Sequence, residues 1–133
     1  MERSRAGLER PGIHLQVKAM TSTDTSQDAL ARLAAVIESR KAINGGDANA
    51  SYVARLLHKG PDSFLKKIGE ESAELIMAAK DGKRLPIVNE ATDLVYHVMV
   101  LMTYFDMSVD DVLQELHRRE GISGIDEKRA RKA

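Results

Sequence analysis

The sequence contains no cysteine, which excludes a disulfide framework, a thiolate nucleophile and a zinc site built on cysteine. We therefore expect a cytoplasmic protein. An excess of charge of one sign is also lacking, because twenty basic residues balance twenty acidic ones. The overall charge thus indicates neither a nucleic-acid backbone nor an anionic membrane as a partner, and an anionic ligand would need a local basic cluster.

A long apolar run is absent as well. The longest nearly apolar stretch, from Leu94 to Phe105, contains His97 and is shorter than the roughly 20 residues that a membrane helix requires. It is better interpreted as a buried core helix. Residues 1–25 lack both apolar periodicity and the apolar block of a secretory signal, so we expect them to form a poorly ordered N-terminal extension.

Apolar residues follow helix-type spacing from Ser26 onward, with no strand-type alternation. The chain has 133 residues, of which 43% are hydrophobic and 30% charged, a profile typical of one soluble globular domain. We predict an all-α helical bundle of about five helices over residues 26–122, completed by dimerisation. Residues 123–133 are predicted to be a polar C-terminal tail.

Glycine and proline signals separate the five predicted helices. We expect Ser26 or Asp28 to cap the first helix and Asp62 or Ser63 to cap the third. Gly82 should end the third helix, which packs against the fourth as a long antiparallel pair. Ser108 should cap the fifth helix. The predicted ranges are 26–42, 51–59, 63–80, 87–105 and 108–120.

Carboxylates are concentrated in two of these helices. Glu71 and Glu74 stand three residues apart, so both project from one helical face, with Glu70 beside them. Glu90 and Asp93 repeat this spacing in the next helix. If the two helices pack through these faces, four carboxylates converge, which is unfavourable unless a divalent cation neutralises them. Oxygen-only ligands favour Mg²⁺ or Mn²⁺, and magnesium in turn prefers phosphate oxygens.

A solvated, ion-paired helix face is the competing interpretation of the first cluster. Lys66 and Glu70, and likewise Lys67 and Glu71, are spaced i, i+4. The second cluster is harder to explain in this way, because Asp93 precedes an almost wholly apolar dozen residues, where an unpaired carboxylate costs several kcal/mol. We therefore favour a functional site.

His97 lies one turn beyond Asp93. Taken alone, it is more typical of a core histidine that is hydrogen-bonded to a neighbour; near the carboxylates it could orient Asp93 or contact substrate. Several basic residues could hold phosphate groups. They are Lys59, Lys66, Lys67, Arg118 and Arg119.

The segments Glu71-Ser-Ala-Glu74 and Glu90-Ala-Thr-Asp93 resemble the ExxE…ExxD signature of the all-α, MazG-type nucleoside triphosphate pyrophosphohydrolase superfamily. Further residues resemble the phosphoribosyl-ATP pyrophosphatase family over roughly Ala29 to Lys132. They are Ser51-Tyr52, Leu56-Leu57, Gly60, Lys67 to Glu74, Ala78 to Lys80, Glu90 to His97, Val100-Leu101, Ser123-Gly124, Glu127-Lys128 and Arg131.

This resemblance implies Mg²⁺-dependent hydrolysis of 1-(5-phosphoribosyl)-ATP to 1-(5-phosphoribosyl)-AMP and pyrophosphate, the second step of histidine biosynthesis. It further implies a homodimer or a dimer of dimers. Glu71, Glu74, Glu90 and Asp93 would be the metal ligands, and Glu70 would be a base or further ligand. The matched motif makes one lysine the first choice for a phosphate contact, namely Lys67.

Three alternatives stay open at this point. One is a housecleaning (d)NTP pyrophosphohydrolase of the same superfamily with the same metal site, against which the Ser-Tyr segment and the C-terminal motif argue. Another is a non-catalytic helical interaction module whose charges are only surface. A di-iron carboxylate bundle is weaker, because neither cluster has a histidine three residues after a glutamate.

Overall fold

A computed structural model describes residues 29–122 and 124–132, and in these residues it contains helices and no strand. The prediction of an all-α fold is therefore confirmed. The predicted extension over residues 1–25 and the predicted caps Ser26 and Asp28 lie outside the described residues. None of the described helices combines the length and the apolar character that crossing a bilayer requires.

The chain divides into two compact units, residues 1–33 and 34–133. In the first unit only residues 29–33 are described, and they are helical. The helix continues into the second unit as far as Ser39, and its Ile37 is fully buried there. The remaining elements all belong to the second unit.

Two of those elements were not predicted as helices. The short η1 is a single turn without apolar periodicity, and α6 is a helix whose described side chains are exposed. Charged residues such as lysine and arginine favour a helix without any apolar stripe, so apolar spacing did not indicate it. In the described residues the elements that follow the first helix, which ends at Ser39, are η1 (Ala42–Asn44), α2 (Tyr52–Lys59), α3 (Pro61–Asp81), α4 (Arg84–Tyr104), α5 (Val109–Arg118) and α6 (Gly124–Lys132).

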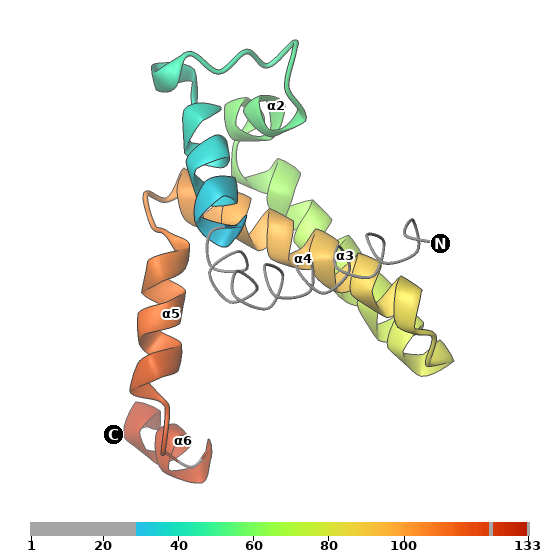
Figure 1. Cartoon of the computed structure of the whole chain (residues 1–133), viewed down its shortest axis with the longest axis vertical. Helices are drawn as coiled ribbons and strands as arrows, with labels where there is room; N and C mark the ends of the chain where they lie inside the picture. The colour runs from blue at the N-terminus through green and yellow to red at the C-terminus, as the bar shows by residue number, and fades with distance from the viewer. Residues whose placement is uncertain (1–28, 123, 133) are drawn as a thin grey trace, which may run out of the picture. The chain divides into compact units, whose positions relative to one another are not determined.

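Helices α3 and α4 run side by side as the predicted antiparallel pair (Figure 1). Gly82 ends α3 in a left-handed conformation with φ 71°, and its N–H reaches the carbonyl groups of Ala78 and Ala79. At the other end of the pair, the ring of Phe64 packs against Tyr104 with centroids 5.3 Å apart. The buried hydrophobic residues are Ile37, Val53, Ala54, Leu56, Phe64, Ala78, Met99 and Val100.

The start of α3 differs from the prediction. Neither Asp62 nor Ser63 caps it; the cap position is Gly60, with φ 93°, and Pro61 is the first helical residue. Proline is pre-organised for that position because its φ is already helical and its missing N–H would have had no partner. The hydroxyl of Ser63 instead donates to the carbonyl oxygen of Leu56 at 3.0 Å, which ties α3 to α2.

The start of α4 also differs, since the helix begins at Arg84 rather than near Ile87. Pro86 is tolerated because it lies within the first turn, where backbone N–H groups have no partner in the helix. The predicted cap of α5 is confirmed. Ser108 forms a capping box with Asp111. The Ser108 hydroxyl accepts a hydrogen bond from the backbone N–H of Asp111, and the Asp111 carboxylate accepts one from the backbone N–H of Ser108.

Candidate active site

The antiparallel pairing of α3 and α4 brings the two carboxylate motifs together. The pKa of Glu90 is raised from its ordinary value, first by a side-chain hydrogen bond with Glu74 and then by burial. The negative charges of Glu74, Asp93 and Glu71 raise it further. Carboxylates from both helices therefore act on one group, as expected if the two helices pack through these faces.

One oxygen of this cluster has no hydrogen-bond partner among the described residues. Oε2 of Glu90 is buried and accepts no hydrogen bond from the described residues. A buried acceptor without a partner is costly, and a bound cation would satisfy it. Among the described residues, no three Asp, Glu or His side chains form a ready-made metal site. The fit to a metal ion therefore rests on this oxygen and on the all-oxygen donor set, which suits Mg²⁺.

Glu71 is held in place by His97. Glu71 is 8% exposed and His97 6% exposed, and Oε2 of Glu71 lies 2.7 Å from Nδ1 of His97. The backbone oxygen of Asp93 lies 3.0 Å from the same nitrogen. Because both neighbours are acceptors, Nδ1 carries the proton and donates it. The second nitrogen, Nε2, is then an acceptor in the neutral ring.

Tyr52 forms a hydrogen bond with that second nitrogen. Its hydroxyl lies 2.8 Å from Nε2 of His97, and the two rings meet edge to face. The pKa of Tyr52 is raised, first by burial and then by the charges of Glu71, Glu70 and Asp93, so the phenol stays protonated and donates. A hydrogen-bond chain thus runs from α2 through His97 to the carboxylate of Glu71.

The Ser-Tyr segment explains how α2 presents this phenol. Ser51 is the cap of α2, where its hydroxyl accepts a hydrogen bond from the backbone N–H of Ala54 at 3.2 Å. The helix therefore begins at Tyr52. The sequence interpretation assigned no role to this tyrosine. Its place in the Ser-Tyr segment of the family resemblance and its position directly after a helix cap were signals, but neither reveals a partner 45 residues away.

The ion-paired interpretation holds for Glu70 and fails for Glu71. Lys66 and Lys67 both pair with Glu70, each with nitrogen and oxygen 3.8 Å apart, at an exposed position. The expected Lys67 to Glu71 pair is replaced by the buried bond to His97. The helix therefore has one solvated carboxylate and, one residue further on, an inward-facing one.

The other predicted substrate contacts are more scattered. Lys59 lies on α2 and lines a separate pocket. Arg119 donates from Nε to Oε1 of Glu115 at 3.0 Å, and no contact in the described residues joins it to the carboxylates of α3 and α4. Both ring nitrogens of His97 are engaged by protein groups. Its predicted contact with substrate is replaced, in this structure, by contacts that orient Glu71.

Residues 30–120 match the family model described as phosphoribosyl-ATP pyrophosphohydrolase. A protein of Variovorax paradoxus (strain S110), named phosphoribosyl-ATP pyrophosphatase, is 61% identical over 118 residues, covering 86% of this chain and 94% of that protein. The protein of that name from Acidovorax sp. (strain JS42) is 59% identical, covering 86% and 92%. The one from Dechloromonas aromatica (strain RCB) is 58% identical, covering 80% and 96%.

Proposed function

Because this chain belongs to the phosphoribosyl-ATP pyrophosphohydrolase family, we propose that it hydrolyses 1-(5-phosphoribosyl)-ATP to 1-(5-phosphoribosyl)-AMP and pyrophosphate. This reaction is the second step of histidine biosynthesis. One observation carries the proposal: in a chain matched by this family over residues 30–120, the carboxylates of Glu74 and Glu90 meet across α3 and α4.

Glu71, Glu74, Glu90 and Asp93 would hold Mg²⁺ or, in its place, Mn²⁺. All four are hard oxygen donors. A bound cation would also satisfy the buried Oε2 of Glu90, which accepts no hydrogen bond from the described residues. When bound, the metal would supply charge neutralisation for the departing pyrophosphate and activation of a water. Carboxylates of like charge repel one another without a cation, which agrees with the raised pKa of Glu90.

The protein's own groups have separate tasks in this proposal. His97, backed by Tyr52, fixes the orientation of Glu71 through the 2.7 Å bond to its Oε2. Glu70 is solvent-exposed and, in the part of the chain that the structure describes, forms ion pairs only with Lys66 and Lys67, so it can turn toward a water as a general base. Lys67 is then released to contact a substrate phosphate, one turn before Glu71.

The test is pyrophosphate release with Mg²⁺ from enzymatically prepared phosphoribosyl-ATP, compared with ATP, dCTP and dUTP. Wild type is compared with Glu74→Gln and with the control Asp81→Asn, which removes an exposed carboxylate at the end of the same helix. We expect release from phosphoribosyl-ATP alone. The rate should fall by orders of magnitude in Glu74→Gln and stay at the wild-type level in Asp81→Asn.

Other outcomes would change the assignment. Preference for a plain nucleotide, still lost in Glu74→Gln, would keep the carboxylate site and make the protein a housecleaning pyrophosphohydrolase. No release from any nucleotide would reject hydrolysis. The buried bond between Glu71 and His97 is an argument against a module with purely surface charges, because such charges have no reason to be buried.

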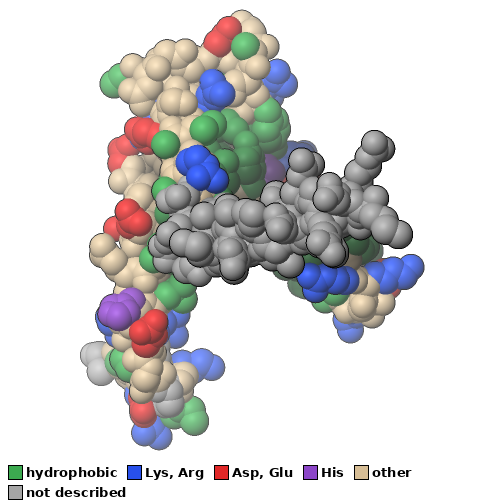
Figure 2. Space-filling model, in the orientation of Figure 1, with side chains coloured by type: hydrophobic (Ala, Val, Ile, Leu, Met, Phe, Trp, Pro, Cys, Tyr) green, Lys and Arg blue, Asp and Glu red, His purple; other side chains and the backbone are tan. Residues whose placement is uncertain are grey.

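We further propose that the chain works in the cytoplasm as a homodimer. Leu85, Val88 and Val95 lie on one stripe of α4 and are 69%, 47% and 50% exposed. Hydrophobic side chains also reach the surface around α2 and the adjoining end of the α3/α4 pair (Figure 2). A second copy packed on α4 would cover its stripe.

The homodimer is tested by light scattering. The variant Val88→Asp/Val95→Asp should be a monomer, whereas wild type and the control Ile43→Asp should be dimers. A monomeric wild type would contradict the proposal.

A further inference from the structure

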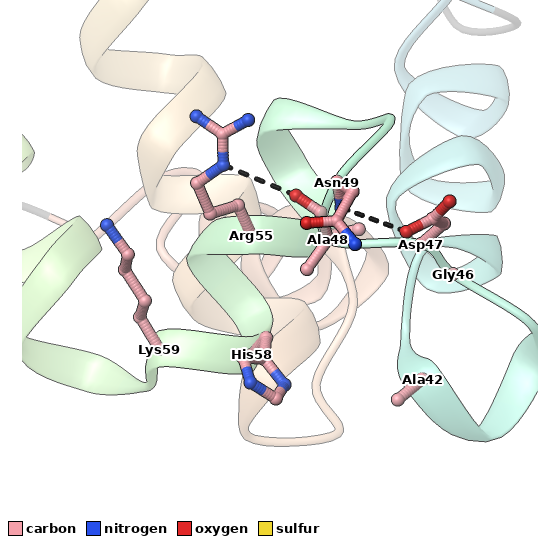
Figure 3. A pocket seen from close by; sticks show the side chains of 9 residues that line it. Ala42, Gly46, Asp47, Ala48, Asn49, Arg55, His58 and Lys59 are labelled. Carbon is pink, nitrogen blue, oxygen red and sulfur yellow. Dashed lines mark hydrogen bonds between the residues drawn. The ribbon is translucent and has the colours of Figure 1, made fainter.

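A cavity of about 510 Å³ lies between α2 and the loop that precedes it (Figure 3). Its volume falls within the range of small-molecule sites, roughly 300–1,000 Å³. None of the residues that line it belongs to the carboxylate cluster or to the hydrogen-bond chain from Tyr52. The functional site described above therefore leaves this cavity without a role.

One wall of the cavity is basic. Arg55, His58 and Lys59 line it from α2, where their i, i+3, i+4 spacing places them on one face (Figure 3). Helix α2 contains no acidic residue, and in the described part of the chain none of the three forms an ion pair. Arg55 and Lys59 repel each other at this spacing. An anion bound between them would remove that repulsion.

The facing wall is a loop held in a defined conformation. Its Ala48 carbonyl oxygen accepts a hydrogen bond from Nε of Arg55 at 3.3 Å. Among the described residues, no hydrogen bond uses the terminal nitrogens of this guanidinium, so they can contact a ligand. The Asp47 carboxylate accepts from the backbone N–H of Asn49 at 2.9 Å. Guanidinium and ammonium groups suit phosphate, while carboxylate and amide groups suit sugar hydroxyls. This lining matches a sugar phosphate.

The position of this wall along α2 links it to the catalytic carboxylates. Tyr52, which reaches Glu71 through His97, comes one turn before Arg55, a rise of about 5 Å, and two turns before Lys59, about 10 Å. Phosphoribosyl-ATP differs from ATP by an additional ribose 5-phosphate. Resting on the function proposed above, we infer that this cavity binds the ribose 5-phosphate group of the substrate, and that Arg55 and Lys59 contact its phosphate.

The kinetic test uses the double variant Arg55→Gln/Lys59→Gln. The control is Lys83→Gln/Arg84→Gln, which removes two charges where α4 begins, after the turn from α3. We expect KM for phosphoribosyl-ATP to rise about 10- to 100-fold in the first variant, since charge-assisted phosphate bonds are lost. Its kcat should change little, because binding remote from the reacting bond is lost. An unchanged KM, or an equal rise in the control, would overturn the inference.

A binding test separates the inference from the proposed function. Wild-type protein is titrated with ribose 5-phosphate, ribose and inorganic phosphate, and backbone amide shifts are followed by NMR. We expect ribose 5-phosphate to shift the amides of Asn49, Arg55 and Lys59 at lower concentration than phosphate, and ribose to shift none.

Each result of the two tests has a distinct meaning. Absent shifts with ribose 5-phosphate, or equal shifts with phosphate, would overturn the sugar-phosphate site even if phosphoribosyl-ATP is hydrolysed. If wild type binds ribose 5-phosphate at these residues but does not release pyrophosphate from phosphoribosyl-ATP, the site stands and the proposed function fails.

Discussion

Nδ1 of His97 lies 2.7 Å from Oε2 of Glu71, so a histidine of α4 holds a carboxylate of α3. Both residues are buried, which strengthens the bond and makes its loss costly. Tyr52 closes the chain from α2 at 2.8 Å. Three helices therefore fix the direction of one carboxylate, as its proposed role as a metal ligand would require.

We expect Tyr52→Phe to lower kcat/KM for phosphoribosyl-ATP about 10-fold and to raise the Mg²⁺ concentration needed for half-maximal rate. The substitution removes only the hydroxyl that holds His97, and loss of such supporting partners typically costs 10- to 100-fold. Steady-state kinetics across a Mg²⁺ series measures both effects. Tyr96→Phe is the control, because it removes a hydroxyl from another ring that packs against His97, with centroids 5.3 Å apart. An equal loss in both variants would mean that the effect is not specific to the hydroxyl that bonds to Nε2 of His97.

Glu90→Gln should stabilise the metal-free protein while abolishing turnover. The pKa of this carboxyl is raised by Glu74, by burial and by Asp93, so its charged form is disfavoured and an uncharged amide relieves the repulsion. Relief of this repulsion should give the variant a higher Tm than wild type in the absence of metal. Calorimetry in EDTA measures this gain. A lower Tm than wild type would mean that the carboxylate makes a favourable contact even without metal.

Mg²⁺ should raise the Tm of wild type and leave that of Glu74→Gln nearly unchanged. A ligand that binds only the folded state stabilises it by about 2.7 kcal/mol at one hundred times its Kd. Thermal unfolding is followed with increasing MgCl₂, with the ionic strength held constant by KCl. Asp81→Asn should respond as wild type does. An identical shift in all three proteins would point to a salt effect rather than to the carboxylate site.

Arg119→Ala should change the titration of Glu115 and leave KM for phosphoribosyl-ATP close to the wild-type value. Hydrogen bonds from Arg118 and then from Arg119 lower the pKa of Glu115 from 4.5 to about 2. Because the folded-state pKa is depressed, the pairing stabilises the fold above pH 4.5 and this contribution is lost as the pH falls toward 2.

In Arg119→Ala, NMR titration should show the pKa of Glu115 closer to 4.5, and acid unfolding should begin at higher pH. A tenfold rise in KM for phosphoribosyl-ATP would instead support the sequence prediction that Arg119 contacts a substrate phosphate.

The helix ends were predictable to the extent that they depend on neighbouring residues. Ser108 and Gly82 were identified correctly because a serine cap and a left-handed glycine act within one turn. The predicted caps Asp62 and Ser63 were wrong because Pro61 already provides a helical φ, and Ser63 bonds to Leu56 instead. Gly60, Asp62 and Ser63 were all possible caps for this helix, and the sequence alone did not show which one would be used.

The sequence by itself determined that Glu71 and Glu74 share one helical face and that Glu90 and Asp93 share another, because the i, i+3 spacing depends only on helix geometry. Only the tertiary structure decided that Glu71 turns inward to His97 while Glu70 stays in solvent with two lysines. The rotation of a helix about its own axis depends on the surface it packs against, and adjacent residues of identical chemistry differ in burial for that reason alone.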